Sequence, residues 1–495
     1  MARINTNVAS LIAQSNLSRS HNDLAVRLQR LSTGLRINRG ADDPAGLIVS
    51  ERLRSEVQGL DQAIHNSERA SLVISTTEAY LAEVADLLNS IKSLVVEAAN
   101  TGALSAEEIE ANQLQIDSAI ESITRISNTA TFAGMQLLNG SMDYITSGVN
   151  NAELTRAKVF SAQFGNNATV PVGVQVVASA RTGSLFLSGI NGAQTGALAS
   201  TVTIEVAGNL GVQTLTFASG TTYASIIAAV NTYKESTGVS ASFFNVTSGG
   251  NSGMRFNSTA YGADQFVSVR KIGSGGELFT LYPAKGTATA VTRGEGRDVT
   301  AVVNGALARG KGLDVSINSP GLSAEFTLST AFNTTVGSLT SSFHITGGGS
   351  TFQLGPTINS NQQIGLGVQS VAASQLGGTS IDGVRYFLDS LKAGGDNAIV
   401  KGQSANATRV LESAINDISI IRGRLGAFER NTIQPNIRAL QIGLENITSS
   451  ESRIRDADFA KETAALTRAQ ILTQAGTSVL ATANVNAQNV LALLG

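Results

Sequence analysis

The sequence predicts an α+β protein of several domains, in which long coiled-coil-like helices from both chain ends form a helical core and a central insertion is mainly β. The first observation is the distribution of glycine: 7 of the 50 glycines fall in residues 1–140, 37 in 141–396 and 6 in 397–495. Glycine-poor segments favour long helices, and glycine-rich segments favour strands and turns. The second is that apolar residues repeat at alternating spacings of three and four near both ends, and alternate with polar residues in the middle.

Two long helices are predicted in the N-terminal segment. The first carries an apolar seam at heptad spacing, which is typical of a helix of over twenty residues packed against other helices. The second begins after Ser105, whose hydroxyl suits the N-cap position, and Glu107 and Glu108 complement the helix dipole in its first turn. The first seam comprises Ile74, Leu81, Val84, Leu88, Ile91, Val95 and Ala98, and the second Ile109, Ile116, Ile120, Ile123 and Ile126.

The same periodicity returns in the C-terminal segment. Pro435 separates two apolar runs, and we expect a kink or a break there because proline removes a helix hydrogen bond and its ring crowds the preceding turn. The runs are Ala407, Leu411, Ala414, Ile418, Ile421, Leu425 and Phe428, and then Ile437, Leu440, Leu444 and Ile447.

The extreme ends of the chain are also predicted to be helical, but their apolar stripes are narrow. An isolated helix is marginal in water, and a seam of this width stays exposed until a partner covers it. We therefore expect both stripes to be covered by a partner. The first is Leu17, Leu24, Leu28, Leu31 and Leu35; the second, diluted with alanine, is Leu472, Val479, Ala483, Val490 and Leu494.

A Gly-Ala-Asp-Asp-Pro sequence at 40–44 interrupts the N-terminal helical pattern. Aspartate at the N-cap and proline at the first helical position are what the start of a helix requires. We expect Asp42, Asp43 and Pro44 to form a joint at which the helix ends and restarts.

The middle of the chain predicts strands and one helix. Alternating apolar residues at 201–208, 212–220 and 264–273 indicate half-buried strands. Residues 222–238 predict one amphipathic helix that ends at Gly238.

Composition argues against most chemical functions. The net charge is −2 and 15% of residues are charged, against about 25% in an average soluble protein, so neither nucleic acid nor a membrane is expected as a partner. With no cysteine, disulfides and thiolate metal sites are excluded. His21, His65 and His344 fall in different predicted elements, and the zinc-protease, nucleophile-elbow and P-loop motifs are absent. The sequence predicts no enzyme, no cofactor and no metal.

Four segments, in order along the chain, resemble those of the bacterial flagellins. They are RINTN (3–7), RLSTGLRINRGADDPAGLIVSERL (30–53), NTATFAGMQLLNG (128–140) and SRIRDADFAKETAALTRAQILTQAGTSVLATANVNAQNVLALLG (452–495). The similar regions cover about residues 1–140 and 397–495. The absence of tryptophan and cysteine and the helical-ends layout are also similar to that family.

The resemblance implies three layers of domains. Residues 1–43 with 451–495 would form a helical pair lining the inner tube of a filament. The two narrow stripes would then be polymerisation seams that cover each other together with neighbouring subunits. Residues 44–167 with 346–450 would form a helical core domain with a β-hairpin near 351–372, and 168–345 an exposed outer region. The hairpin is a departure, since some flagellins place it before the outer insertion and here it follows.

The resemblance also implies a function: an extracellular structural subunit that polymerises with itself into the helical filament used for motility. Implied partners are the flagellar type III export apparatus, a cytoplasmic export chaperone at the C-terminal helix, and hook-associated junction and cap proteins. A host Toll-like receptor is expected to respond weakly, since Leu88, Ile91 and Leu94 match recognised flagellins but Ser90 and Gln115 replace an arginine and a glutamate. Two alternatives stay open: a hook-filament junction protein, and a binding or adhesion module on a flagellin scaffold.

Overall fold

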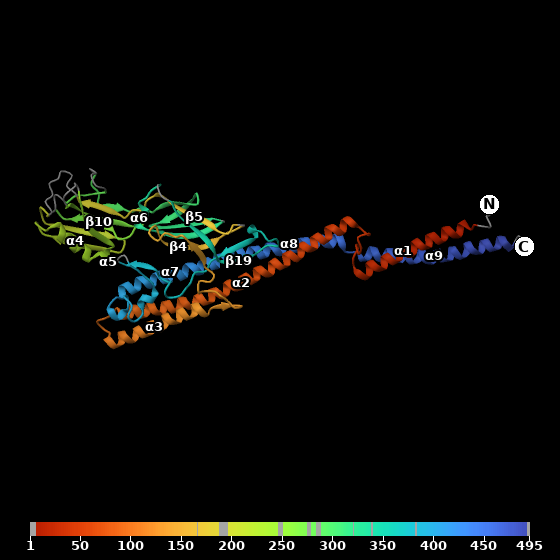
Figure 1. Ribbon diagram of the computed structural model, residues 1–495, viewed down its shortest axis with the longest axis horizontal. Coiled ribbons are helices and arrows are strands. Elements are labelled where there is room, and N and C mark those ends of the chain that lie inside the picture. Colours follow the sequence, from red (N-terminus) through yellow and green to blue (C-terminus); the bar gives the residue numbers. More distant parts are fainter. Residues whose placement is uncertain are drawn as a thin grey trace. The chain divides into compact units, whose positions relative to one another are not determined.

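The computed structural model of the chain describes residues 6–165, 167–187, 197–245, 251–274, 279–283, 289–319, 321–337, 340–381 and 384–492. It divides into two compact units, which are described separately. The first unit comprises residues 1–75, 353–363 and 424–495, and the second 76–352 and 364–423. The predicted class is confirmed: helices from both chain ends flank a β-rich central region (Figure 1). None of the helices in these ranges combines the length and apolar character needed to cross a membrane.

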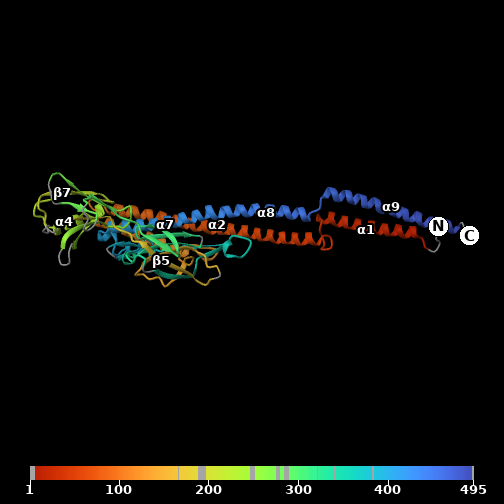
Figure 2. The same cartoon turned by 90° about the horizontal axis from the view of Figure 1, so that it is seen from above.

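Two antiparallel helix pairs build the first unit, as Figures 1 and 2 show from two sides. Helix α1 (Val8–Thr33) lies along α9 (Phe459–Ala492), and the first part of α2 (Pro44–Ala98) lies along α8 (Gln434–Arg455). The second pair buries a small apolar cluster of Leu60, Ala63, Ile64 and Leu440, with Leu444 and Ile447 packed against it.

The sequence predicted a kink or a break at Pro435. The helix does not break there, and one wide turn lies just before the proline. Residues Glu429–Ile433 form a π-helical turn between α7 (Ser404–Phe428) and α8. A proline ring crowds the carbonyl of the residue four positions earlier, here Asn431, and a π turn moves that carbonyl aside. The strain of the proline is therefore absorbed without ending the helix.

The helical part of the second unit is a packed bundle. It contains the end of α2, then α3 (Ala106–Thr129), and α7. The predicted N-cap is confirmed, since Ser105 and Glu108 form a reciprocal capping box. Leu81, Val84, Leu88, Ile91, Ile116, Ile120, Ile123, Ala407, Leu411 and Ala414 are all completely buried.

The largest sheet of this unit has eight strands in the order β3-β18-β5-β14-β15-β16-β17-β4. We call this sheet and its core the first β module. Its core contains Val172, Val174, Phe326 and Phe343 and is continuous across the sheet. The strands are β3 (Tyr144–Ser147), β4 (Leu154–Ala162), β5 (Val170–Ala178), β14 (Thr300–Val303), β15 (Ala306–Lys311), β16 (Asp314–Ser319), β17 (Leu322–Leu328) and β18 (Thr340–Gly348), with α6 (Thr330–Asn333) after β17.

The second β module is inserted between β5 and β14. Two four-stranded sheets, β12-β6-β10-β9 and β13-β11-β7-β8, share one core with helix α4 (Tyr223–Thr232). The strands are β6 (Ser184–Leu187), β7 (Val202–Gly208), β8 (Val212–Phe217), β9 (Val239–Asn245), β10 (Asn251–Ser258), β11 (Phe266–Ile272), β12 (Leu281–Tyr282) and β13 (Arg293–Glu295).

Sequence reasoning located three of these strands but was wrong about the helix in one detail. The stretches 201–208, 212–220 and 264–273 contain β7, β8 and β11. The segment 222–238 forms two helices, because Tyr233 leaves the helical conformation between α4 and α5 (Lys234–Thr237). Gly238 ends the segment with a left-handed φ of 71°.

The remaining elements are short. Three two-stranded sheets pair β1 (Thr131–Phe132) with β2 (Met135–Gln136), β19 (Ser350–Gln353) with β20 (Gln363–Leu366), and β21 (Thr379–Ile381) with β22 (Val384–Tyr386). The 3₁₀ turns are Ser360–Gln362, Leu388–Leu391 and Ile399–Lys401.

Candidate assembly interface

The two chain ends meet in one antiparallel pair of helices, α1 and α9. Near the chain termini, Asn7 Nδ2 donates to the carbonyl oxygen of Ala483 at 2.9 Å, and Ser10 Oγ donates to Asn484 Oδ1 at 2.8 Å. At the other end of the pair, Arg27 contacts Glu462. These contacts fix the register of the two helices over their described length.

The seam between α1 and α9 mixes leucines with small and polar side chains. On α1 the partly or fully buried positions follow heptad spacing, as do those on α9. Among the residues of the pair whose side chains the structure describes, only Ala13, Ala469 and Glu462 are buried. The seam positions are Ala13, Leu17, Ser20, Leu24, Arg27 and Leu31 on α1, and Glu462, Leu466, Ala469, Thr473, Gly476, Leu480 and Ala483 on α9.

Small residues on α9 let α1 approach closely. A Cβ atom placed on Gly476 would lie 3.1 Å from Leu17 Cδ1, tighter than most real contacts. Leu17 therefore packs over the glycine, and this part of the seam is held by close backbone approach. Dispersion contacts of this kind are individually small, so the pair alone buries little apolar surface.

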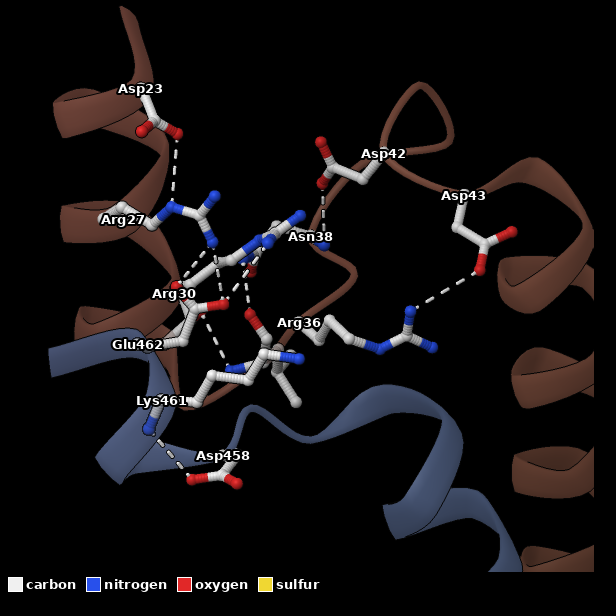
Figure 3. Close-up of polar contacts among 12 residues, drawn as sticks. Asp23, Arg27, Arg30, Arg36, Asn38, Asp42, Asp43, Asp458, Lys461 and Glu462 are labelled. Carbon is white, nitrogen blue, oxygen red and sulfur yellow. Dashed lines mark hydrogen bonds and ion pairs between the residues drawn. The ribbon is translucent and has the colours of Figure 1, made fainter. Parts of the chain in front are cut away.

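A buried carboxylate anchors the base of the pair (Figure 3). Glu462 on α9 accepts hydrogen bonds from Arg27 Nη1 at 2.9 and 3.1 Å and from Arg30 Nη1 at 3.3 Å. Arg27 is held in turn by Asp23, with Nε 3.2 Å from Oδ1. Burial alone would raise the pKa of Glu462, but the hydrogen bonds and charge of Arg27 and Arg30 outweigh it and hold the pKa below its ordinary value.

The joint between the helix pairs is a hydrogen-bonded crossing of two chain segments. Gly34 ends α1 with φ 72°, and its carbonyl accepts from Ala457 N at 2.9 Å. Arg36 N donates to the Arg455 carbonyl at 2.7 Å, and the Arg36 guanidinium donates to the Ile454 carbonyl at 2.6 and 3.2 Å. The two chain segments of the joint are thus hydrogen-bonded directly to each other, and Ile37 is buried at the joint.

The predicted restart residues occupy two different roles at this joint. Asp43 Oδ1 accepts from Gly46 N at 2.9 Å at the start of α2, whose first residue is Pro44. Asp42 Oδ2 accepts from Asn38 N at 3.0 Å and Arg39 N at 2.9 Å and closes the preceding loop. These backbone hydrogen bonds lower the pKa of Asp42.

The structure separates the predicted seam residues into two faces. Leu17, Leu24, Leu31 and Ala483 are half-buried between α1 and α9, and Leu35 is half-buried at the joint, bridged to Asp456. Leu28, Leu472 and Val479 are 50, 50 and 57% exposed and face away from the pair. The side chain of Val490 and the whole of Leu494 lie outside the described residues.

Sequence reasoning missed the residues that hold the pair together. It followed the large apolar side chains of α9, whereas the observed seam uses Glu462, Ala469, Thr473 and Gly476. The available signal was small residues at spacings of three and four, together with one acid opposite the arginines of α1. The large apolar residues outside this seam are exposed along the length of the pair, and we call them together the second stripe: Val8, Leu11, Ile12, Val26 and Leu28 on α1, and Phe459, Ile471, Leu472, Val479 and Val485 on α9.

The predicted receptor-like patch is only partly at the surface. Ser90 and Gln115 are exposed and Leu94 is half-buried. Leu88 and Ile91 are completely buried, because they belong to the same helix face as Leu81, Val84 and Val95. They cannot contact a partner while the bundle is folded, so their inclusion in a surface patch was wrong.

No group of three or more histidine, aspartate or glutamate side chains capable of holding a metal ion is found within the described part of the chain.

Comparisons with known proteins agree with this layout of the ends. Residues 4–143 match the bacterial flagellin N-terminal helical region, and residues 408–494 match the bacterial flagellin C-terminal helical region. Flagellin of Salmonella choleraesuis is 29% identical over 99% of both chains. Among solved structures, a flagellar hook-associated protein-3 of Legionella pneumophila is 10% identical, covers 82% of this chain and 98% of its own, and has a TM-score of 0.30. Because B-type flagellin of Pseudomonas aeruginosa is 33% identical over 99% of both chains, this chain belongs to the bacterial flagellins.

Proposed function

We propose that the α1/α9 pair is the main polymerisation element of this flagellin, a structural subunit of the extracellular filament of the bacterial flagellum. The observation that carries the proposal is the second apolar stripe, which includes Leu11, Ile12, Leu28, Leu472 and Val479. Exposed apolar surface of this extent along one helix pair is typical of an interface. Neighbouring copies of the same pair supply matching stripes, and contacts that do not close into a ring generate an open helical polymer.

The domain division follows from the same proposal. Residues 1–43 with 451–495 line the inner tube, residues 44–167 with 346–450 form the core domain, and residues 168–345 are exposed outside. The hydrogen-bonded joint at Leu35 and Asp456 supports the first boundary. In this division the second β module lies in the outer region, and the strands of the first β module are shared between the outer region and the core domain.

The same stripe suggests the partners that act before and during assembly. An export chaperone that covers Leu472 and Val479 on α9 prevents early polymerisation, and the flagellar type III apparatus exports the chain. Hook-associated junction and cap proteins meet the two ends of the polymer. Each of these partners would bind a surface that lacks a cover within the single chain.

We also propose that the chain has no catalytic role and only weak activity toward the host Toll-like receptor. Flagellins are structural proteins. At the receptor-like surface, exposed Ser90 offers a short hydroxyl where an arginine offers a planar group for bidentate and stacking contacts.

Electron microscopy of seeded polymerisation tests the main proposal. The full chain is compared with a chain lacking residues 451–495 and with a Leu472→Ser, Val479→Ser double variant. We expect long filaments from the full chain, none from the truncation, and few and short ones from the double variant.

An Ala481→Ser, Thr482→Ser variant on the exposed side of α9 is the matched control and should polymerise normally. Normal filaments from the Leu472 and Val479 variant would overturn the assignment of the stripe. A full chain that is incorporated only as a short collar at the hook tip would instead favour a junction protein.

A further inference from the structure

A cleft of about 880 Å³ lies where the chain crosses between the first and second β modules. Residues 179–183 lead from β5 into β6, and residues 296–299 return from β13 to β14. The two crossings pair with each other: Arg181 N donates to the Arg297 carbonyl at 2.8 Å, and Arg297 N donates to the Arg181 carbonyl at 2.9 Å. Clefts of this size at the junction of two modules are common ligand sites.

The floor of the cleft is rigid because several backbone segments touch there. A Cβ atom on Gly294 would lie 2.2 Å from the Ser184 carbonyl oxygen, and one on Gly296 would lie 2.2 Å from that of Gly262. The Asn333 amide also binds both backbone groups of Ala180, at 2.6 and 3.0 Å. A floor built in this way is formed before any ligand arrives, which lowers the entropic cost of binding.

The lining of the cleft is basic although the chain carries a net charge of −2. Arg181, Arg293 and Arg297 face one acid, Glu295, an excess of two positive charges. Arg181 and Arg297 are directly opposite each other in an antiparallel bridge, so their side chains project to the same side of the paired backbones. Like charges in that position are destabilising unless an anion lies between or beside them.

The arginines differ in how they are held. Arg297 donates to the Ser179 carbonyl at 2.8 and 3.2 Å. Arg293 lies 3.9 Å above the ring of Phe266, and its Nε donates to Glu295 Oε1 at 3.2 Å, which leaves its Nη groups for a ligand. The exposed guanidinium of Arg181 makes no hydrogen bond or ion pair with any described residue. The side chains of Arg297 and Arg293 are thus held in place by the protein, and the Arg181 guanidinium is available to bind a ligand.

A fourth arginine lies beside the cleft. Arg255 on β10 is the direct partner of Phe186 on β6, and Phe186 lines the cleft. Directly opposed residues in a sheet share one face. The Nε atom of Arg255 is buried and has no hydrogen-bond partner in the described structure, which leaves an unsatisfied donor on the face that Phe186 presents.

The walls add aromatic and hydroxyl groups to these cations. Phe186 and Tyr261 are half-exposed, and Thr182, Ser184 and Thr334 carry hydroxyls. The Ser184 and Thr334 hydroxyls donate within the protein, so their oxygens remain as acceptors. Aromatic faces pack against the C–H faces of sugar rings, hydroxyls bond to sugar hydroxyls, and guanidinium groups bind carboxylate or sulfate in a bidentate manner. We propose that this cleft binds an acidic oligosaccharide, whose acid groups are held by Arg181 and Arg293. A nucleic acid fits less well, because it requires an extended basic face.

Calorimetric titration of the full-length monomer tests the proposal. The probes are a sulfated hexasaccharide from heparin, a carboxylated hexasaccharide of galacturonic acid, neutral maltohexaose, and a single-stranded oligonucleotide of six phosphates. We expect at least one of the acidic sugars to bind and maltohexaose to bind about tenfold more weakly or less, since charge-assisted hydrogen bonds carry most of the affinity. Because the heparin fragment carries both sulfate and carboxylate groups, binding of the galacturonic acid hexasaccharide with similar affinity would show that carboxylates are sufficient.

The decisive variant is Arg181→Gln, because the Arg181 guanidinium makes no hydrogen bond or ion pair with the residues that the structure describes. It should weaken binding of the acidic sugar about tenfold. Arg125→Gln, at an exposed position on α3 with the same loss of charge, should change the affinity less than about twofold. Equal losses in both variants, equal binding of maltohexaose, absent binding of both acidic sugars, or tighter Arg181-dependent binding of the oligonucleotide would each overturn the proposal.

Discussion

The α1/α9 pair and the helical bundle of the second unit have the same heptad spacing but bury very different amounts of apolar surface. In the bundle, Leu88, Ile91 and Ile116 are completely buried. In the pair, Leu17 and Leu24 are half-buried and Leu28 is 50% exposed. Two helices leave most of each stripe uncovered, whereas three helices enclose a core. Heptad spacing therefore predicts where a stripe lies, and the number of helices around it decides whether one chain can cover it.

The polar anchors of the two regions differ in the same way. Asp417 on α7 is bound by Arg156 at 2.9 Å and Lys158 at 2.7 Å, both on β4, and ties the bundle to a sheet that has its own core. Burial alone would raise the pKa of Asp417, but the two cations hold it below its ordinary value. Glu462 joins α1 and α9, whose seam contains many small and half-buried side chains. An ion pair supplements packing in the bundle and replaces it in the terminal pair.

The largest expected effect is the loss of a core leucine from the bundle. Leu88→Ala removes a completely buried side chain, and such changes cost about 2–5 kcal/mol of unfolding free energy. Leu28→Ala removes a half-exposed side chain of the terminal pair and should stay within about 0.5 kcal/mol in the monomer. Denaturant titration of dilute monomer, followed by circular dichroism, measures both. Similar costs for the two variants would contradict the distinction between a covered and an uncovered stripe.

A smaller effect is expected from removing the anchor of the pair. Glu462→Ala leaves Arg27 and Arg30 without the carboxylate that binds both, and hydrogen bonds to charged groups contribute about 1.5–3 kcal/mol. Because much of the seam between α1 and α9 consists of small and half-buried side chains, amide hydrogen exchange of α1 and α9 should accelerate while that of α3 stays unchanged. Glu83→Ala, at an exposed position on α2, is the control. Unchanged exchange in α1 would show that the apolar seam alone holds the pair.

The pair should also open in acid before the bundle does. The folded pKa of Glu462 lies below its ordinary value, which is about 4.3 in a model peptide. The stability that this carboxylate contributes is therefore present above that value and is lost as the pH falls through the folded pKa. Proteolytic release of α9 between pH 6 and pH 3 by an acid-active protease measures this opening. Glu462→Gln should remove most of the pH dependence, and an unchanged profile would exclude Glu462 as its source.

Particular residues show which parts of the fold could be predicted from the sequence. Ser105, the heptad seams of the bundle and the strands β7, β8 and β11 follow from local chemistry and periodicity, and all were predicted. The seam of α9 was not, because Thr473 and Gly476 are small or polar, and their place in a seam depends on the register with α1. The arginine cleft was also unpredictable, since Arg181 and Arg297 are brought together by two distant chain crossings.

The smallest effect on stability is expected on the outer face of the bundle, at Ser90. Its side chain is exposed while Leu88 and Ile91 on either side are buried. Ser90→Arg should therefore change the unfolding free energy by less than about 0.5 kcal/mol, yet it adds a guanidinium capable of bidentate and stacking contacts.

We expect a stronger response to the Ser90→Arg variant from reporter cells that carry the flagellin-sensing Toll-like receptor, with Ser55→Arg elsewhere on α2 as the control. An equal rise from the control would indicate a general effect of positive charge. A strong response from the unsubstituted chain would mean that receptor contacts do not depend on this position. Unchanged stability with Ser90→Arg would show that the exterior of the bundle can vary without disturbing its core. If the exposed stripe of the terminal pair mediates assembly as proposed, the same freedom is not expected there.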